Sequence, residues 1–317
     1  MKSVVLRGIA VLLGSAVLVE TVPASGSESK PNVILILADD MGWGDPQCYN
    51  PESKIPTPHM DRLAKEGMRF TDAHTPSSVC TPTRYGLLTG RYCWRTWLDK
   101  GVLDGFGPPL IESGQTTVAS FLKSQGYATG CIGKWHLGMK WFDKAGQPLG
   151  VRGTGVGFRP GTDVDFERPI TGQPLDCGFD MFFGISASLD MSPYCFIDGR
   201  QTVGVPDQES AENRDTLVRN GVAGVKTADF TLEGVLPAFK ARAVKFVEER
   251  AADRSTPFFL YLPLNSPHLP VVPNEAFRGK SGAGDYGDFV VETDDCIGGI
   301  LEALDEAGVA ENTLVIV

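Results

Sequence analysis

The stretch NVILILA, residues 32–38, decides the fold, and it ends directly in Asp39 and Asp40. An uninterrupted apolar run rich in branched side chains is typical of a strand that is buried on both faces, as in a parallel sheet. Such a sheet needs a layer of helices on each face. The run therefore predicts an α/β protein with two aspartates at the carboxyl end of its first strand.

The rest of the chain alternates helical and extended patterns. Helices are predicted over residues 57–67, 115–125, 237–249 and 289–304, where apolar side chains recur at helical spacing. Strands are predicted at 127–132, 258–262 and 313–317. This alternation predicts a mostly parallel central sheet sandwiched by helices.

Two segments, 143–176 and 198–231, interrupt the alternation and are rich in glycine, proline and charged residues. Long connections of this kind are often functional lids or insertions. They are the first place to look for substrate selectivity, although exposed loops without a role fit the composition equally well.

The amino terminus has the layout of a secretory signal peptide. Lys2 and Arg7 precede an apolar run over residues 9–19, and small residues follow around Ala24. The apolar run is shorter than the roughly 20 residues that span a bilayer. We expect residues 1–24 to be cleaved and the remaining domain, 25–317, to be periplasmic or extracellular, without a stable membrane anchor.

The net charge of −10 argues against a nucleic-acid partner. An anionic substrate would therefore require positive charge to be concentrated locally in its site. The composition, 42% hydrophobic and 21% charged, is otherwise that of an ordinary globular protein.

A second informative motif is Cys80-Thr-Pro-Thr-Arg84. It places a thiol at the start of a predicted short helix, with an arginine four positions later on the same helical face. A lone cysteine near a proline can equally be a buried, inert thiol. The choice between these interpretations depends on the other polar residues at strand ends.

Three further groups of polar residues follow predicted strands. Asp39 and Asp40 are hard oxygen ligands that suit Ca²⁺ or Mg²⁺, or else form a solvated acidic turn. Lys134 and His136, held between glycines in GKWHLG, can offer an anion clamp and a titrating group. His268, in the turn after 258–262, is another titrating group. Ligands of open α/β sheets bind at this carboxyl edge.

Together these segments resemble type I, formylglycine-dependent sulfatases of the arylsulfatase kind, within the alkaline phosphatase superfamily. The resemblance rests on residues 31–45, 80–91, 133–138, 266–268 and 288–317, which occur in the family's order. It implies the alkaline phosphatase-like fold and hydrolysis of sulfate monoesters, of carbohydrates or aryl compounds. It also implies a formylglycine-generating enzyme that oxidises the cysteine during maturation.

The resemblance assigns a role to each residue of the motifs. Asp39 and Asp40 would bind calcium, and Cys80 would become the formylglycine, which also touches the metal. Arg84 would support that group electrostatically, and Lys134 would hold a sulfate oxygen. The two histidines would act on protons, His136 at the formylglycine diol and His268 at the ester oxygen of the leaving group.

The chain departs from the family's pattern at its end. It stops at Val317, before the family's second metal-ligand pair and its small C-terminal domain. We expect an incomplete catalytic domain of a longer sulfatase, with a short, inactive sulfate or glycan binder as the alternative. Among enzymes, the alternative is a phosphoester or phosphonate hydrolase of the same superfamily.

Overall fold

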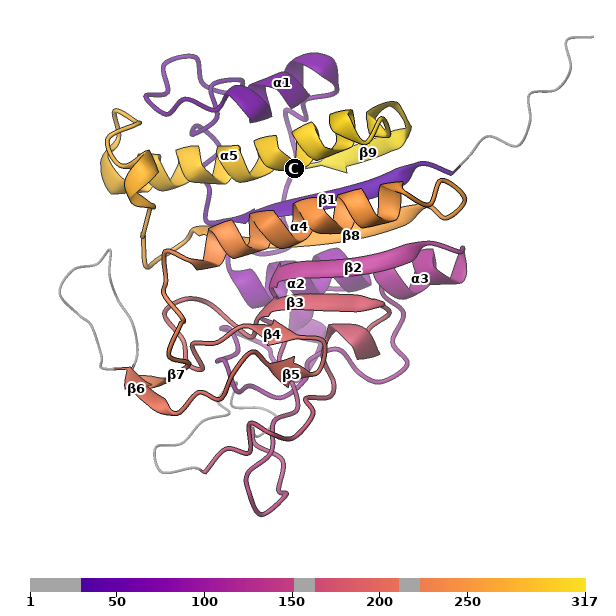
Figure 1. Ribbon diagram of the computed structural model, residues 1–317, viewed down its shortest axis with the longest axis vertical. Helices are drawn as coiled ribbons and strands as arrows, with labels where there is room; N and C mark the ends of the chain where they lie inside the picture. The colour runs from indigo at the N-terminus through magenta and orange to yellow at the C-terminus, as the bar shows by residue number, and fades with distance from the viewer. Residues whose placement is uncertain (1–29, 151–162, 211–222) are drawn as a thin grey trace, which may run out of the picture.

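A computed structural model of the 317-residue chain describes residues 30–150, 163–210 and 223–317 (Figure 1). The predicted signal peptide, residues 1–24, lies outside the described residues. So do parts of the two predicted loop segments, 151–162 and 211–222.

A seven-stranded sheet in the order β5-β4-β3-β2-β8-β1-β9 forms the centre of the molecule. Its five strands from β3 to β9 pair in parallel, and β4 and β5 add an antiparallel edge. The strands are β1 (Asn32–Asp39), β2 (Ala128–Lys134), β3 (Met181–Ile185), β4 (Ile197–Asp198), β5 (Gln201–Thr202), β8 (Phe258–Pro267) and β9 (Thr313–Ile316). A separate antiparallel pair consists of β6 (Gln208–Ser210) and β7 (Gly224–Lys226). The prediction of a mostly parallel sheet is confirmed.

Helices cover both faces of this sheet. Helix α4 (Val235–Ala251) lies in front of β8 in Figure 1, α5 (Gly284–Glu306) packs against α4 and β8, and α1 (Pro58–Glu66) packs on α5. Helices α2 (Cys80–Thr89) and α3 (Val118–Ser124) lie behind. The short 3-10 turns are η1 (Cys93–Arg95), η2 (Pro174–Asp176), η3 (Glu275–Phe277) and η4 (Ala310–Asn312).

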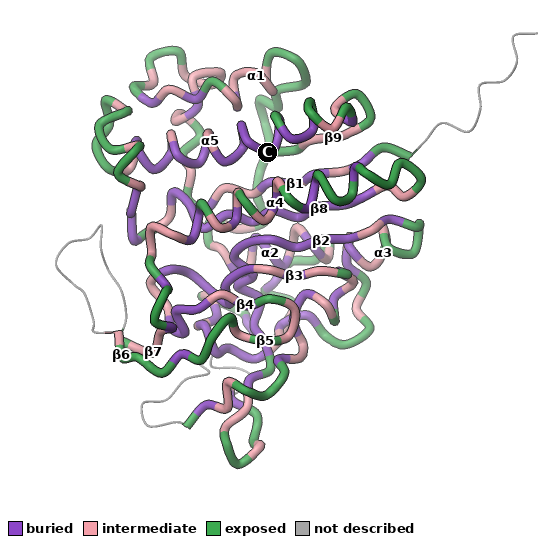
Figure 2. The backbone as a smooth tube through the Cα atoms, viewed as in Figure 1, coloured by how far each residue is buried: buried purple, intermediate pink, exposed green. Residues whose placement is uncertain are grey.

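Two hydrophobic cores result, one on each side of the sheet. Leu262 of β8 packs with Phe239 of α4 and Ile297 of α5, whereas Tyr261 faces the core that contains Leu88 of α2. Every residue of β8 is buried, and Figure 2 shows the same burial along β2. Alternate side chains of a central strand therefore serve opposite layers, as the continuous apolar run predicted.

All four predicted helices and all four predicted strands are present, and several boundaries differ, two of them for a reason that the structure shows. Helix α3 begins at Val118, not 115, because the Thr117 side chain accepts a hydrogen bond from Ser120 N and so fixes the helix start. Strand β8 continues five residues beyond 262, and its Pro267 lies in register with Asp39 of β1. Among the described residues, no helix is long and apolar enough to cross a membrane.

Candidate functional site

The sequence-predicted residues come together at the carboxyl edge of the parallel sheet. Asp39 is the last residue of β1 and Lys134 the last residue of β2. His268 directly follows β8, which lies between those two strands. Cys80 is the first residue of α2, as predicted, and is partly exposed. The site is therefore assembled by parallel strands that end at one edge.

A buried ionic cluster forms the centre of the site. Oδ2 of Asp39 accepts a hydrogen bond from Lys134 Nζ and lies 3.2 Å from Arg84 Nη2. Burial by itself raises the pKa of the Asp39 carboxyl, but the charges of Lys134 and Arg84 outweigh burial and hold that pKa well below its usual range. Asp39 therefore stays ionised wherever the protein is folded.

Arg84 contacts residues of three strands, and its side chain is buried. Only 1% of its side chain is exposed. Its Nη1 donates to the carbonyl oxygen of Lys134 at 2.5 Å, and its Nη2 donates to that of Leu264 at 3.1 Å. Burial disfavours the charged guanidinium, but the Asp39 carboxylate raises the pKa of Arg84 overall. A fixed positive charge thus lies beneath the first turn of α2.

Ser188, which sequence reasoning missed, links two predicted site residues. Its Oγ accepts a hydrogen bond from Lys134 Nζ at 3.1 Å and lies 3.1 Å from His268 Nδ1. Nδ1 also contacts the carbonyl oxygen of Leu269 at 2.5 Å, and a carbonyl only accepts, so Nδ1 carries a proton. Nε2 of the same ring faces Asp40 Oδ2 at 3.5 Å.

No local pattern indicates Ser188, because β3, the strand before it, was not predicted. Its five residues, MFFGI, form too short an apolar run to separate from the surrounding loop. The short strand nevertheless pairs with β2 up to Ile185 and Lys134, and this pairing brings the following loop to the site.

His136 is fully buried and has an acceptor nitrogen without a partner. Its Nε2 lies 2.7 Å from the carbonyl oxygen of Leu103, which fixes the proton on Nε2. Nδ1 then has an unshared lone pair, and it has no hydrogen-bond partner among the described residues. Burial, together with the Lys134 charge, lowers the pKa of His136 well below its usual value. The imidazole is therefore neutral, and its Nδ1 lone pair is available as a hydrogen-bond acceptor.

Backbone strain accompanies two of these residues. Asp40 and His136 are the non-glycine residues with positive φ in the described chain, at 63° and 54°. Such conformations cost about 1–3 kcal/mol each and persist where the surrounding structure imposes them. The Oγ1 of Thr81, next to Cys80, donates to the backbone oxygen of His136 at 2.9 Å and helps to hold this turn.

The two aspartates fit part of a calcium site. The Lys134 and Arg84 side chains contact Oδ2 of Asp39, and no hydrogen bond to Oδ1 is found within the described ranges. The Asp40 side chain is 56% exposed and borders the same edge. Ca²⁺ takes about six to eight oxygen ligands. The described residues contain no cluster of three or more acidic, histidine or cysteine ligands, so these carboxylates supply only a share of that shell.

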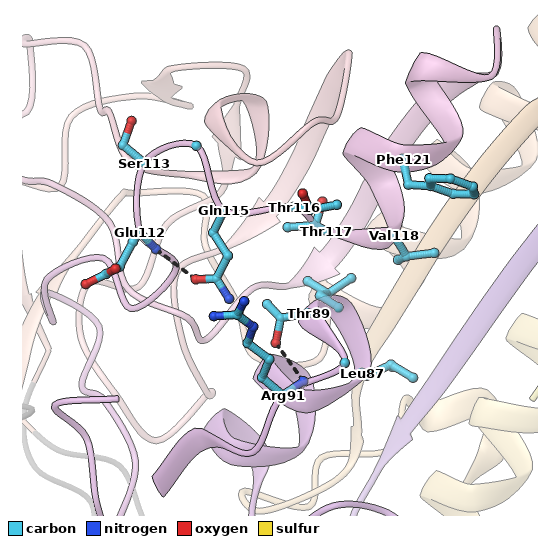
Figure 3. A pocket seen from close by; sticks show the side chains of 13 residues that line it. Leu87, Thr89, Arg91, Glu112, Ser113, Gln115, Thr116, Thr117, Val118 and Phe121 are labelled. Carbon is cyan, nitrogen blue, oxygen red and sulfur yellow. Dashed lines mark hydrogen bonds between the residues drawn. The ribbon is translucent and has the colours of Figure 1, made fainter. Parts of the chain in front are cut away.

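A groove of about 710 Å³ lies away from this constellation, between the end of α2 and the start of α3 (Figure 3). Some of its polar side chains form hydrogen bonds with other residues of the chain. Gln115 Nε2 donates to Tyr85 Oη at 2.9 Å, and Thr89 Oγ1 donates to the Tyr85 backbone oxygen at 2.7 Å. None of the predicted site residues lines it. This groove is therefore distinct from the candidate functional site.

Comparison with known proteins finds relatives that match most of the chain. The family model described as Sulfatase matches residues 31–317. An N-acetylgalactosamine-6-O-sulfatase of Bacteroides thetaiotaomicron is 36% identical over 343 residues, which covers 98% of this chain and 62% of that protein. Arylsulfatase A of Homo sapiens is 35% identical over 300 residues, covering 90% and 51%.

A solved Bacteroides thetaiotaomicron structure, described in work on glycosaminoglycan metabolism, superimposes with a TM-score of 0.75 at 32% identity. The match covers 90% of this chain and 61% of that one. This chain thus spans between 51% and 62% of the length of the relatives named above.

Proposed function

The chain belongs to the sulfatase family, and we propose that it provides the catalytic site of a hydrolase for sulfate monoesters of carbohydrates. The observation that carries the proposal is the buried ionic cluster of Asp39, Arg84 and Lys134 next to Cys80. The names of the relatives favour a sulfated amino sugar, N-acetylgalactosamine 6-sulfate, as the substrate class.

The charge balance of the site supports a bound divalent cation. Asp39 and Asp40 carry two negative charges, and Arg84 and Lys134 carry two positive charges. The buried ionic cluster and the neighbouring Asp40 are therefore neutral when counted together, in a chain whose net charge is −10. An anionic sulfate ester needs a surplus of positive charge there. Ca²⁺ held by Asp39 and Asp40 would supply it and would also polarise the sulfate group.

We propose that Cys80 is converted to formylglycine by a formylglycine-generating enzyme. Hydration of that aldehyde would supply a geminal diol, whose two hydroxyls serve as nucleophile and as the exit route for sulfate. The position suits this role, because residue 80 opens α2, the helix that carries Arg84, and lies near enough to interact electrostatically with that guanidinium. Arg84 keeps this region positive without leaving the protein interior.

The remaining residues would transfer protons and bind the sulfate oxygens. Lys134 Nζ, held between Asp39 and Ser188, is placed to donate to a sulfate oxygen. His136 Nδ1 has the free lone pair that a general base needs. His268 would protonate the leaving oxygen through Nε2, since its Nδ1 proton is held by Leu269.

Two measurements test the proposal. Mass spectrometry of the peptide that contains residue 80, from protein produced with the maturation enzyme, should show formylglycine. The protein should release sulfate from N-acetylgalactosamine 6-sulfate and leave the corresponding phosphate intact. An unmodified thiol in fully active protein contradicts the formylglycine assignment, and preferential hydrolysis of the phosphate favours a phosphoester hydrolase.

We also propose that the protein is exported, on the basis of the predicted signal peptide at residues 1–24. Amino-terminal sequencing of the protein recovered from the periplasm or medium tests this. A start near residue 25 agrees with export and cleavage, whereas an intact Met1 on protein retained inside the cell contradicts it.

A further inference from the structure

The loop that follows β1 presents a large aromatic side chain to solvent beside the site. Trp43 is 70% exposed, although a tryptophan buries a large apolar area in most proteins. It lies three residues after Asp40, so their Cα atoms are at most about 11 Å apart. Asp40 in turn lies 3.5 Å from His268, the residue proposed to face the leaving group.

This loop is rigidly held. The Tyr286 hydroxyl of α5 lies 3.1 Å from the backbone oxygen of Asp40 and 2.6 Å from Asp45 Oδ2. Gly42 N donates to that same carboxylate oxygen at 2.6 Å. A Cβ at position 42 would lie 2.9 Å from it, so only glycine fits without a shift. Burial, together with Asp45, raises the pKa of Tyr286, which keeps the hydroxyl protonated.

Trp43 is also supported from within its own loop. Its ring lies 5.8 Å from that of Tyr49, at an interplanar angle of 51°. Tyr49 donates from its hydroxyl to the backbone oxygen of Phe70 at 3.0 Å, and the guanidinium of Arg69 lies 5.5 Å from its ring. A rigid ring that is supported yet 70% exposed has apolar surface available for a ligand.

We propose that Trp43 is a specificity-determining residue that packs against the sugar ring of the leaving group. This inference rests on the proposed sulfatase function and narrows the substrate to sulfated pyranosides. A pyranose has an apolar C–H face that can lie on an indole, whereas the sulfate itself gains nothing from an aromatic surface. Trp43 therefore contributes affinity for the sugar, while Lys134 contributes affinity for the sulfate.

Equilibrium binding to protein with Cys80→Ala tests this without turnover. Calorimetric titration compares N-acetylgalactosamine 6-sulfate with inorganic sulfate. In this background Trp43→Ala should raise the Kd of the sugar sulfate about threefold to tenfold and leave the Kd of sulfate unchanged. Trp43→Phe should recover most of the loss, because it keeps an aromatic face.

A matched control is Trp94→Ala, since Trp94 is 63% exposed and stacks on Tyr92 beyond the other end of α2. It should leave both constants unchanged. The inference is overturned if Trp43→Ala leaves the sugar sulfate unaffected, or weakens both ligands equally. If neither ligand binds when Trp43 is present, the proposed function itself fails, and the assignment of Trp43 fails with it.

Discussion

Replacement of Arg84 by alanine should destabilise the protein far more than loss of a surface ion pair. Breaking a buried ion pair costs about 3–5 kcal/mol. Each buried carbonyl left without a donor costs a further 1–3 kcal/mol or so, and Arg84 serves two, those of Lys134 and Leu264. Two features of the site reduce this sum. Lys134 still compensates Asp39, and Arg84 Nε is itself unpaired in the described structure.

We therefore expect a loss of about 4 kcal/mol in the free energy of unfolding, a large share of the roughly 5–15 kcal/mol typical of folded proteins. Urea denaturation followed by tryptophan fluorescence measures it. Arg242→Ala is the matched control, because its pair with Asp198 spans 2.9 Å but both side chains are about one-third to one-half exposed. That variant should lose no more than about 1 kcal/mol.

Arg84→Met separates charge from packing in the same experiment. It keeps most of the side-chain volume but removes the charge and the donors, so its loss should approach that of Arg84→Ala. The reasoning is refuted if Arg84→Ala destabilises the protein no more than Arg242→Ala. It is also refuted if Arg84→Met restores stability, because the arginine would then act only as a space filler.

The other predictions concern the proposed chemistry. Cys80→Ser should remove multiple turnover and leave at most one sulfate per chain, measurable by intact mass; continued turnover would exclude the formylglycine route. Ser188→Ala should lower kcat about tenfold or more with little change in urea midpoint, because it breaks the link between Lys134 and His268; an unchanged kcat would make Ser188 structural. The folded-state pKa of His136 lies below its unfolded value, so stability should fall as the pH decreases below about 6.5, and His136→Gln should flatten that part of the urea-midpoint profile; a profile identical to wild type contradicts the lowered pKa. Added Ca²⁺ should raise Tm, and Asp40→Asn should weaken that dependence; an equal Ca²⁺ response in the variant would remove Asp40 from the metal site.

The positions that the sequence predicted well are those fixed by local pattern. An apolar run that ends in polar residues defines a buried strand and its polar terminus, so the sequence alone places Asp39, Lys134 and His268 at one sheet edge. The strand order and register that bring them together are non-local, yet parallel strands in a single sheet leave few alternatives. The structure therefore has these three residues at the predicted edge of the sheet.

The interactions that the sequence did not predict depend on distances between elements. Helix α1 illustrates this: its Thr57 has no capping hydrogen bond, and Asp294 of α5 accepts from His59 N and Met60 N instead. Ser188 is similar, since its partners come from β2 and the end of β8. Such contacts require the packing of helix on helix or loop on sheet, which local patterns do not encode.

The two aspartates differ in exposure and in their contacts. Asp39 is 5% exposed, and the positively charged side chains of Lys134 and Arg84 contact its carboxylate, so it is held ionised and in one position. Asp40 has a positive φ, its side chain is 56% exposed, and one of its carboxylate oxygens lies 3.5 Å from His268. A metal ion bound at this edge would therefore contact one carboxylate that is already ordered, Asp39, and one whose position can adjust, Asp40.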